Sequence, residues 1–501
     1  MMTTLVTDYL EKTADNFPDK VAFADDNTSM TFSELRDSSR RVATVLAKHG
    51  FFKQPVAIYL DKSPACIAAF MGVAYSGNFY TPIDVKMPAS RVEKIIDTLQ
   101  PGAIITDEEH RLEAEKFAGN CKVLIYSEMC DNLVDDALLA ETRSKIIDTD
   151  VLYVLFTSGS TGIPKGVIIG HKALIAYTEW VSKEFAVSEH EVLGNQTPFY
   201  FSMSVLDIYQ TIRNGATMYI IPKQLFSFPI RLLEYIQEKK INFIYWVPSA
   251  LCLPANLKAL GKRDISCLKK VLFAGEVMPT KQLNAWRNEL PNVEFANLFG
   301  PTEVTDICSF YRVTRELSNS ESVPIGKACA NADLLILDDN DKEVGFGTMG
   351  ELCVRGSFLA YGYYKNKEKT AEAFVQNPLN HSYQEVIYRT GDLVRYNEYG
   401  ELVYICRKDF QIKHMGHRIE LGEIETAVSS IEGVHANVCL YDEKKSRIVL
   451  FYTGAIPETK VGEILQDLLP EYMLPNKRYQ LPVMPLNLNG KIDRQELKKR
   501  L

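Results

Sequence analysis

The residues whose types and spacing best suit chemistry lie in one short run, LFTSGSTGIPKGV at positions 155–167. Glycines let a backbone approach a ligand closely, hydroxyls donate hydrogen bonds, and Lys165 adds a positive charge. The run therefore predicts a loop that binds a polyphosphate. Its spacing differs from the two common glycine-rich phosphate motifs, G-x-x-x-x-G-K-[ST] and G-x-G-x-x-G. A flexible surface turn is the alternative, and the combination of an apolar segment, hydroxyls, a proline and a lysine argues against it.

Apolar strands and amphipathic helices alternate around this loop and would position it. Residues 151–156 are typical of a buried strand that ends at the loop. Similar apolar runs lie at 56–60, 103–106, 123–126, 218–221, 243–246 and 271–274. After the loop, four apolar residues recur at helical spacing and are expected to face a core: Leu174, Tyr177, Val181 and Phe185. The alternation predicts an α/β fold with parallel sheets covered by helices.

The length of the chain, 501 residues, indicates at least two domains. Residues 394–406 are typical of a hairpin turned at 397–400, and a new pattern of strands and helices starts after them. We therefore expect a large N-terminal domain of helix-covered β-sheets over residues 1–408. A small α+β C-terminal domain is expected over residues 409–501.

Composition limits the classes of partner. The formal net charge of −8 argues against nucleic acid or an anionic membrane as the main partner. The longest apolar stretch, residues 66–75, is too short to span a bilayer, and the start of the chain lacks a basic leader. None of the ten cysteines forms a C-x-x-C pair. These features predict a cytoplasmic protein with reduced thiols.

Five further motifs follow the loop: FGPTE at 299–303, GEL at 350–352, YRTGD at 388–392, RKDFQIK at 407–413 and NGKID at 489–493. Together with the loop they resemble the acyl-adenylate-forming superfamily, which contains peptide-synthetase adenylation domains, acyl-CoA synthetases and luciferases. The run RIELGEIE at 418–425 resembles the peptide-synthetase and D-alanine–carrier-protein ligase branch. The resemblance implies an AMP-forming ligase that uses ATP and Mg²⁺ to turn a carboxylic acid into an acyl-AMP and then into a thioester.

The same resemblance implies the residues that bind ATP. Those expected at the β- and γ-phosphates are Thr157, Ser158, Gly159, Ser160, Thr161, Gly162 and Lys165. Phe299 would stack near the adenine, and Asp392 and Arg407 would hold the ribose. Thr302 would contact the α-phosphate, and Glu303 would ligate Mg²⁺, which prefers hard oxygen donors.

Three residues near the C-terminus carry implied roles in catalysis and movement. Lys491 would bridge the carboxylate and the α-phosphate as charge builds between them. Asp409 would be the hinge about which a mobile C-terminal domain turns, and Gly416 would border the tunnel for the thiol. Cys406 departs from the family pattern, which usually has glycine at that position.

The expected acceptor is the phosphopantetheine arm of a separate carrier protein. The branch motif favours a carrier over coenzyme A, and no carrier segment with a modifiable serine follows the motif at 489–493, so we expect action in trans. An acyl-CoA synthetase is an alternative because it shares the first half-reaction. Activation of an amino acid in the manner of a D-alanine ligase is another.

The residues expected to line the acid pocket are Ser202, Met203, Leu206, Tyr245, Leu272, Ala274, Leu298, Asp306 and Ile307. Amino-acid-activating relatives have an aspartate in place of Ser202 to bind the α-ammonium group, and a buried ammonium without a carboxylate is costly. The sequence therefore argues against an ordinary α-amino acid. An aryl or hydroxyaryl acid whose phenol reaches Asp306 is preferred. The alternatives are an acid with a displaced amine that pairs with Asp306, and a purely local capping role for Asp306.

Overall fold

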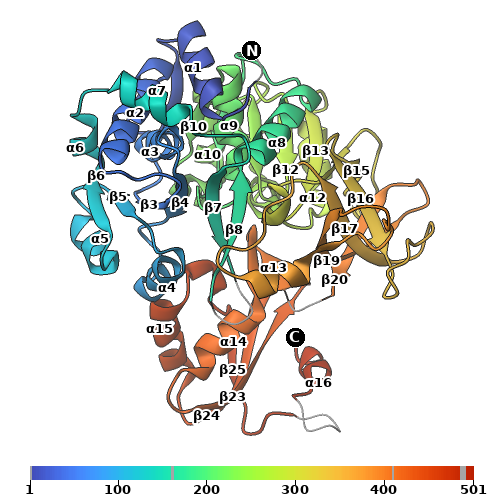
Figure 1. Ribbon diagram of the computed structural model, residues 1–501. Coiled ribbons are helices and arrows are strands. Elements are labelled where there is room, and N and C mark those ends of the chain that lie inside the picture. The colour runs from blue at the N-terminus through green and yellow to red at the C-terminus, as the bar shows by residue number, and fades with distance from the viewer. Residues whose placement is uncertain (1–2, 159–162, 409–410, 486–491) are drawn as a thin grey trace. The chain divides into compact units, whose positions relative to one another are not determined.

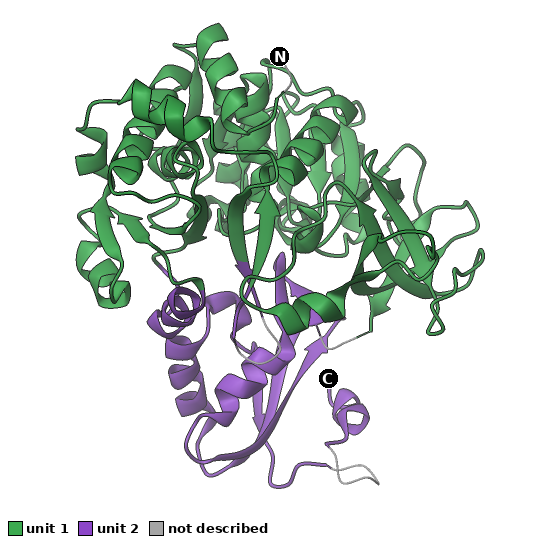
Figure 2. Cartoon of the chain, in the orientation of Figure 1, with its two compact units in different colours: residues 1–85, 99–155, 166–408 green, residues 86–98, 156–165, 409–501 purple. Residues whose placement is uncertain are grey.

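The computed structural model describes residues 3–158, 163–408, 411–485 and 492–501 (Figure 1). The chain divides into two compact units (Figure 2). Unit 1 comprises Met1–Val85, Leu99–Leu155 and Gly166–Lys408, and unit 2 comprises Lys86–Thr98, Phe156–Lys165 and Asp409–Leu501. Six residues with expected roles lie outside the described residues: Gly159, Ser160, Thr161, Gly162, Asp409 and Lys491.

Unit 1 contains a nine-stranded sheet among its described residues. Its order is β15 (Lys327–Ala328), β14 (Ser309–Arg312), β13 (Glu294–Phe299), β12 (Lys270–Phe273), β11 (Phe243–Trp246), β9 (Val192–Asn195), β10 (Thr217–Ile220), β1 (Val21–Ala24) and β2 (Ser29–Thr31). The six strands from β13 to β1 are parallel, and antiparallel strands flank them on both sides. The carboxyl ends of β11, β12 and β13 therefore lie at one edge.

A six-stranded sheet has the order β6 (Lys122–Ile125), β5 (Ala103–Thr106), β3 (Pro55–Tyr59), β4 (Phe79–Ile83), β7 (Val151–Thr157) and β8 (Lys165–Gly170). The first five are parallel. Every strand expected from an apolar run in the N-terminal 300 residues is present. The strands expected at 56–60, 123–126, 218–221 and 271–274 each end one residue earlier in the structure, and after β6 Tyr126 already begins a helix.

The helices of unit 1 are α1 (Thr7–Asn16), α2 (Phe32–Lys48), α3 (Pro64–Tyr75), α5 (Arg111–Ala118), α6 (Tyr126–Cys130), α7 (Asp136–Arg143), α8 (His171–Glu184), α9 (Ser204–Asn214), α10 (Pro229–Glu238), α11 (Pro248–Asn256), α12 (Thr280–Glu289) and α13 (Lys367–Ala373), with 3₁₀ turns η1 (Lys223–Ser227) and η2 (Thr302–Val304). The apolar stretch at 66–75 belongs to α3, which Ser63 caps and which is buried on all sides. Its length suits a core helix. Helix α2 begins with a capping box between Thr31 and Glu34.

A single hydrophobic core joins the two large sheets to helices α2, α3, α8 and α9. It contains Ile58 and Tyr80 from the six-stranded sheet and Leu193 and Met218 from the nine-stranded sheet. A second core lies under α10, α11 and α12. The expected fold of parallel sheets with helices packed against them is confirmed for this unit.

A five-stranded antiparallel sheet completes unit 1. Its strands are β16 (Ala332–Leu337), β17 (Gly350–Gly356), β18 (Phe374–Gln376), β19 (Val386–Tyr396) and β20 (Leu402–Arg407). Strands β19 and β20 form the expected hairpin, turned by residues 397–401. Three of the motifs, at 350–352, 388–392 and 407–413, therefore begin in this sheet.

Unit 2 has its own core of strands and helices. Its strands are β21 (Gln411–His414), β22 (His417–Glu420), β23 (Val434–Asp442), β24 (Arg447–Gly454) and β25 (Lys477–Gln480). Its helices are α14 (Leu421–Ser429), α15 (Glu458–Leu468), α16 (Arg494–Lys498), the 3₁₀ turn η3 (Glu471–Met473) and all but the last residue of α4 (Ala89–Leu99). The core packs α14 and α15 against β23 and β24. The α+β class expected for this part of the chain is confirmed.

Candidate active site

The nine residues expected to line the acid pocket come together in unit 1. Tyr245 lies on β11, Leu272 on β12 and Leu298 on β13, and the register pairs Tyr245 directly with Leu272. These strands are parallel neighbours, and ligands of α/β sheets bind at the carboxyl ends of such strands. Ala274 directly follows β12, and the other members come from two further segments: Ser202, Met203 and Leu206 lie before and in the first turn of α9, and Asp306 and Ile307 follow η2. All nine are buried, and seven belong to the core shared by the two large sheets.

Asp306 is the centre of the polar part of this cluster. It is 1% exposed, and its Oδ2 atom accepts hydrogen bonds from the hydroxyls of Tyr177 at 2.8 Å and Tyr245 at 3.0 Å. Its Oδ1 atom accepts one from the hydroxyl of Ser202 at 3.2 Å. The local capping role that the sequence left open does not account for these three contacts, because all three donors are side chains far away in the sequence. Asp306 instead joins three separate segments: α8, β11 and the chain just before α9.

The backbone at Asp306 is held in an unusual conformation. Thr305 and Asp306 have positive φ angles of 52° and 80°, which cost free energy for residues other than glycine. Gly300 lets this segment approach β13, since a Cβ atom there would lie 2.4 Å from the carbonyl oxygen of Asp306. Such strain clusters at functional sites and persists only where the surroundings fix it. The glycine of the FGPTE motif is therefore needed to bring the carboxylate into place.

Burial is the largest influence on the pKa values of Asp306, Tyr177 and Tyr245. Desolvation raises the pKa of Asp306 to about 7, although the hydrogen bonds from Tyr177, Tyr245 and Ser202 act in the opposite direction. Burial, and then the nearby Asp306 carboxylate, raise the pKa of both phenols well above the usual value. Tyr177 and Tyr245 therefore stay neutral donors, and Asp306 changes charge near neutral pH.

Tyr177 is a site residue that the sequence reasoning missed. The helical spacing correctly predicts that it faces the core, since it is fully buried on α8. Its hydroxyl, however, reaches a carboxylate 129 residues further along the chain. A tyrosine among apolar residues at helical spacing could have indicated a polar contact in the core, because a buried phenol needs a hydrogen-bond partner.

Replacing Tyr177 with phenylalanine should raise the pKa of Asp306 further, because one hydrogen bond that favours the carboxylate is lost. With acids that bind to the carboxylate form, kcat/KM at pH 7 should fall by about tenfold, the size expected for a bond to a charged group. The midpoint of the pH profile of kcat/KM should move upward. The matched control is Tyr209→Phe, which removes a buried phenol that contacts Tyr80 instead. An unchanged midpoint in Tyr177→Phe would contradict this role.

A second polar chain leads from the acid cluster to the FGPTE motif. The hydroxyl of Thr302 donates to that of Ser202 at 3.3 Å, so Ser202 contacts both Thr302 and Asp306. Glu303 is fully buried, and its carboxylate accepts a hydrogen bond from Tyr363 at 2.7 Å. The residues implied at the α-phosphate and at Mg²⁺ thus lie next to the residues implied for the acid.

The residues expected at the nucleoside lie on β13, β19 and β20. Arg407 donates to Oδ1 of Asp392 at 3.0 Å and to the carbonyl oxygen of Thr390 at 2.9 Å. The side chain of Asp392 is 2% exposed and that of Arg407 is 7% exposed. Phe299 packs against Tyr404 with a ring separation of 5.9 Å. The carboxylate and the guanidinium are therefore oriented by each other before any ligand binds.

Within the run expected to bind phosphate, the described residues 156–158 and 163–165 belong to unit 2. The hydroxyl of Ser158 donates to the carbonyl oxygen of Arg418 at 2.6 Å and accepts from the amide of Glu420 at 3.2 Å. Lys165 lies 3.5 Å from the carboxylate of Glu420. The Thr157 hydroxyl contacts the carbonyl oxygen of Lys165. Thus Ser158 and Lys165 contact protein groups in this structure, and a phosphate would have to replace these contacts.

Gly416 forms the turn between β21 and β22 with a φ angle of 79°. Cys406, the departure from the family pattern, is exposed on β20.

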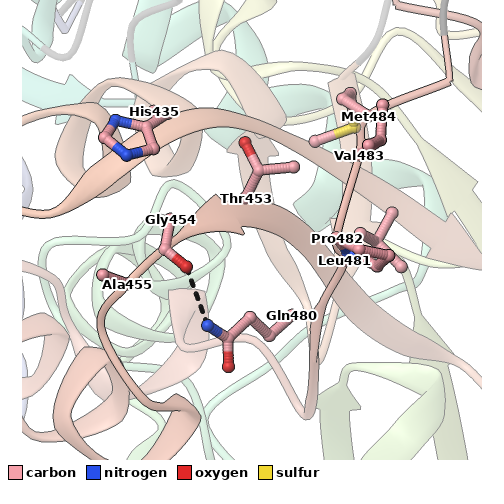
Figure 3. Close-up of a pocket in the computed structure, with 9 residues that line it drawn as sticks. All are labelled: His435, Thr453, Gly454, Ala455, Gln480, Leu481, Pro482, Val483 and Met484. Carbon is pink, nitrogen blue, oxygen red and sulfur yellow. Dashed lines mark hydrogen bonds between the residues drawn. The ribbon is translucent and has the colours of Figure 1, made fainter.

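A separate pocket in unit 2 is bordered by His435 and by residues 453–455 and 480–484 (Figure 3). Among the described residues, none of those expected in the active site lines this pocket.

Glu303 fits the implied magnesium ion. Mg²⁺ in nucleotide sites is usually held by one or two carboxylates together with substrate phosphates. The described residues contain no cluster of three or more histidine, cysteine, aspartate or glutamate side chains able to hold a metal. A single buried carboxylate suits an ion that arrives with ATP.

Comparison with known proteins identifies the family. The family model for the AMP-binding enzymes matches residues 10–364. L-proline--[L-prolyl-carrier protein] ligase of Streptomyces coelicolor is 34% identical over 468 residues, which cover 88% of this chain and 86% of that protein. Zwittermicin A synthase ZmaJ of Bacillus cereus is 32% identical over 516 residues, which cover 99% and 95%. The chain belongs to the AMP-binding enzyme family. It is an adenylation enzyme, an AMP-forming ligase.

Solved structures share the fold. The Vibrio cholerae adenylation domain AlmE, in complex with glycyl-adenosine-5'-phosphate, matches with a TM-score of 0.85 and 21% identity, covering all of this chain and 98% of that one. Other relatives are much longer, since the chain spans 9% of a linear gramicidin synthase polypeptide of Brevibacillus parabrevis and 19% of a mycosubtilin synthase polypeptide of Bacillus subtilis. No helix within the described part of the chain has the length and apolar character required to cross a membrane.

Proposed function

We propose that this enzyme activates a carboxylic acid that carries a cationic amine, and then transfers the acyl group to the phosphopantetheine thiol of a carrier protein. The RIELGEIE run at 418–425 and the similarity to a prolyl-carrier-protein ligase support a carrier as the acceptor. The observation that supports the amine most strongly is the buried carboxylate of Asp306.

The arrangement around Asp306 favours a cation over a phenol. Oδ2 already accepts two phenolic hydrogen bonds, whereas the described residues supply Oδ1 with the Ser202 hydroxyl alone. A buried carboxylate is stabilised most by an opposite charge, and a substrate ammonium next to Ser202 would supply one. It would also lower the pKa of Asp306 and keep it ionised.

This proposal reverses the order of the two substrate classes favoured from sequence. An aryl or hydroxyaryl acid remains the second candidate, because its phenol could donate to Oδ1 and its ring would fit apolar neighbours such as Met203, Leu206 and Leu298. The absence of an aspartate at position 202 still argues that the amine is not held where α-amino-acid-activating relatives hold it. An acid with its amine displaced from the α-carbon satisfies both observations.

In the first half-reaction, a carboxylate oxygen of the substrate attacks the α-phosphorus of ATP. A P–O bond forms to that oxygen, and the bond to pyrophosphate breaks. Thr302 would orient the α-phosphate, Lys491 would neutralise the charge between the two reactants, and Asp392 with Arg407 would hold the ribose. Mg²⁺ bound by Glu303 would neutralise phosphate charge as pyrophosphate leaves.

In the second half-reaction, the thiol attacks the acyl carbon of the mixed anhydride. A thioester forms, AMP leaves with the electron pair, and the thiol proton passes to solvent or to a base. We propose that unit 2 turns about Asp409 between the two steps and that the thiol arm passes Gly416. A turn with positive φ at this glycine allows the close backbone approach that a narrow tunnel needs.

The test is acid-dependent exchange of labelled pyrophosphate into ATP. The acids should include β-amino acids, D-alanine, L-amino acids including proline, hydroxybenzoates and benzoate. Highest activity with an acid whose amine lies beyond the α-carbon is expected. Strong activity with D-alanine or proline would refute the argument from Ser202, and strong activity with hydroxybenzoates alone would favour the second candidate. Comparing free coenzyme A with a phosphopantetheinylated carrier then identifies the acceptor.

A further inference from the structure

Glu351, at the start of β17, connects three positions of unit 1 through one carboxylate. Its Oε1 atom accepts the backbone N–H of Gly391 at 3.2 Å. Its Oε2 atom accepts a hydrogen bond from Arg389 at 3.0 Å and lies 3.5 Å from the ammonium of Lys408. The side chain of Glu351 is 8% exposed. Neither the sequence motifs nor the proposed reaction assigns it a role.

The positions that Glu351 connects lie beside the nucleoside residues. Gly391 precedes Asp392, and Lys408 follows Arg407. The backbone amide of Lys408 donates to the carbonyl oxygen of Gly391 at 2.8 Å, so the two segments are also bonded directly. The segment expected at the ribose and residues 407–408 are thus held as one piece.

Lys408 is the last residue of unit 1, and the long segment of unit 2 begins at the next residue. Any change in the orientation of that segment needs a fixed point on the unit 1 side. The side chain of Lys408, held by the nearly buried carboxylate of Glu351, supplies this fixed point. The second carboxylate near Lys408, that of Asp339 at 2.8 Å, is 87% exposed, so solvent screens it.

We propose that Glu351 is a positioning residue for acyl transfer. It holds Lys408 against the turn expected to bind the ribose, so that the end of unit 1 stays in place when unit 2 rotates after adenylation. Without the negative charge of Glu351, the positive charges of Arg389 and Lys408 are no longer neutralised by a carboxylate between them. Lys408 is then held less firmly, and the end of β20 becomes more mobile. The proposal rests on the two half-reactions described above, and it makes the second more sensitive to Glu351 than the first.

The test uses the full-length protein with Glu351→Gln and Lys408→Met. Glutamine keeps an acceptor for Gly391 but removes the charge that binds both cations. Transfer of the acyl group to free pantetheine should slow about tenfold in both variants, while pyrophosphate exchange stays within about threefold. Hydrogen exchange at the Lys408 amide should be faster in Glu351→Gln. The matched control, Asp339→Asn, removes the exposed partner of the same lysine and should change none of these quantities.

The readouts separate this proposal from the proposed function. Absence of pyrophosphate exchange in the wild type with every acid would refute the function, while hydrogen exchange at Lys408, with and without AMP, would still test the role of Glu351. Equal losses in both half-reactions together with a lower melting temperature would show a merely structural role and overturn the proposal. Unchanged hydrogen exchange and unchanged transfer in Glu351→Gln would also overturn it.

Discussion

Asp306→Asn is expected to lower kcat/KM for an amine-bearing acid by about two to four orders of magnitude. Removing one partner of a buried ion pair costs about 3–5 kcal/mol, and 1.36 kcal/mol corresponds to tenfold in rate. The asparagine is nearly isosteric and can still accept from Tyr177 or Tyr245, so the loss reports the charge and not the shape. Pyrophosphate exchange with the best acid from the panel, and with benzoate, measures the effect.

The matched control for this variant is Asp207→Asn. Asp207 is also buried, on α9, and its carboxylate accepts from Asn195 at 2.7 Å, but it is not among the pocket residues. Its replacement should preserve the preference for an amine over benzoate. If Asp306→Asn retained the wild-type preference, the amine would have to bind elsewhere.

The pH dependence of the wild type provides an independent check on Asp306. Because its pKa is raised to about 7, the carboxylate form that binds a cation is lost as the pH falls below 7. In the free enzyme, kcat/KM for an amine-bearing acid should fall about tenfold for each pH unit below that midpoint. An aspartate with an ordinary pKa would give a flat profile down to about pH 5. The profile with benzoate should lack this step.

Lys491→Ala is expected to reduce pyrophosphate exchange by about three orders of magnitude, to near background. Removing one group that stabilises the charge of a transition state typically costs 10²–10³-fold, and here the attacking carboxylate and the α-phosphate are both anions. Binding of ATP should change little, since the other ATP-binding residues remain. The exchange assay and equilibrium nucleotide binding measure the two quantities separately.

The control for Lys491 is Lys499→Ala in the same C-terminal region. Lys499 is exposed and pairs with Glu496 at 2.8 Å, a contact that contributes little to stability. This variant should retain full exchange. Wild-type exchange in Lys491→Ala would remove that lysine from the mechanism.

Much of the fold follows from local pattern. The apolar runs locate seven strands of the two large sheets, β3, β5, β6, β7, β10, β11 and β12, and miss parallel strands such as β1, β4, β9 and β13. The strand predictions succeed because the burial of a strand is a property of a short segment. Four of the nine expected pocket residues lie on or directly after the neighbouring parallel strands β11, β12 and β13, and the other five come from the start of α9 and from the chain after η2.

The polar contacts of the site could not be predicted in the same way. The spacing of α8 places Tyr177 in a core, but nothing local indicates that its hydroxyl meets Asp306. Glu351 likewise contacts Gly391 and Lys408, which are 40 and 57 residues away and reach it only through the pairing of β17, β19 and β20. Such contacts depend on how strands from distant segments align, which composition and periodicity do not specify.

The two consecutive positive φ angles at Thr305 and Asp306 limit how selectivity at this site can be redesigned or can drift during evolution. Asparagine and glycine adopt the left-handed region readily, whereas other residues are strained there by about 1–3 kcal/mol, as Thr305 already is. In a library that randomises position 306 fully, most members would carry this strain as well as a changed side chain, so a loss of activity would not report substrate preference alone. New specificities are more accessible at Ser202 and Tyr177, whose side chains face the same carboxylate from ordinary backbone.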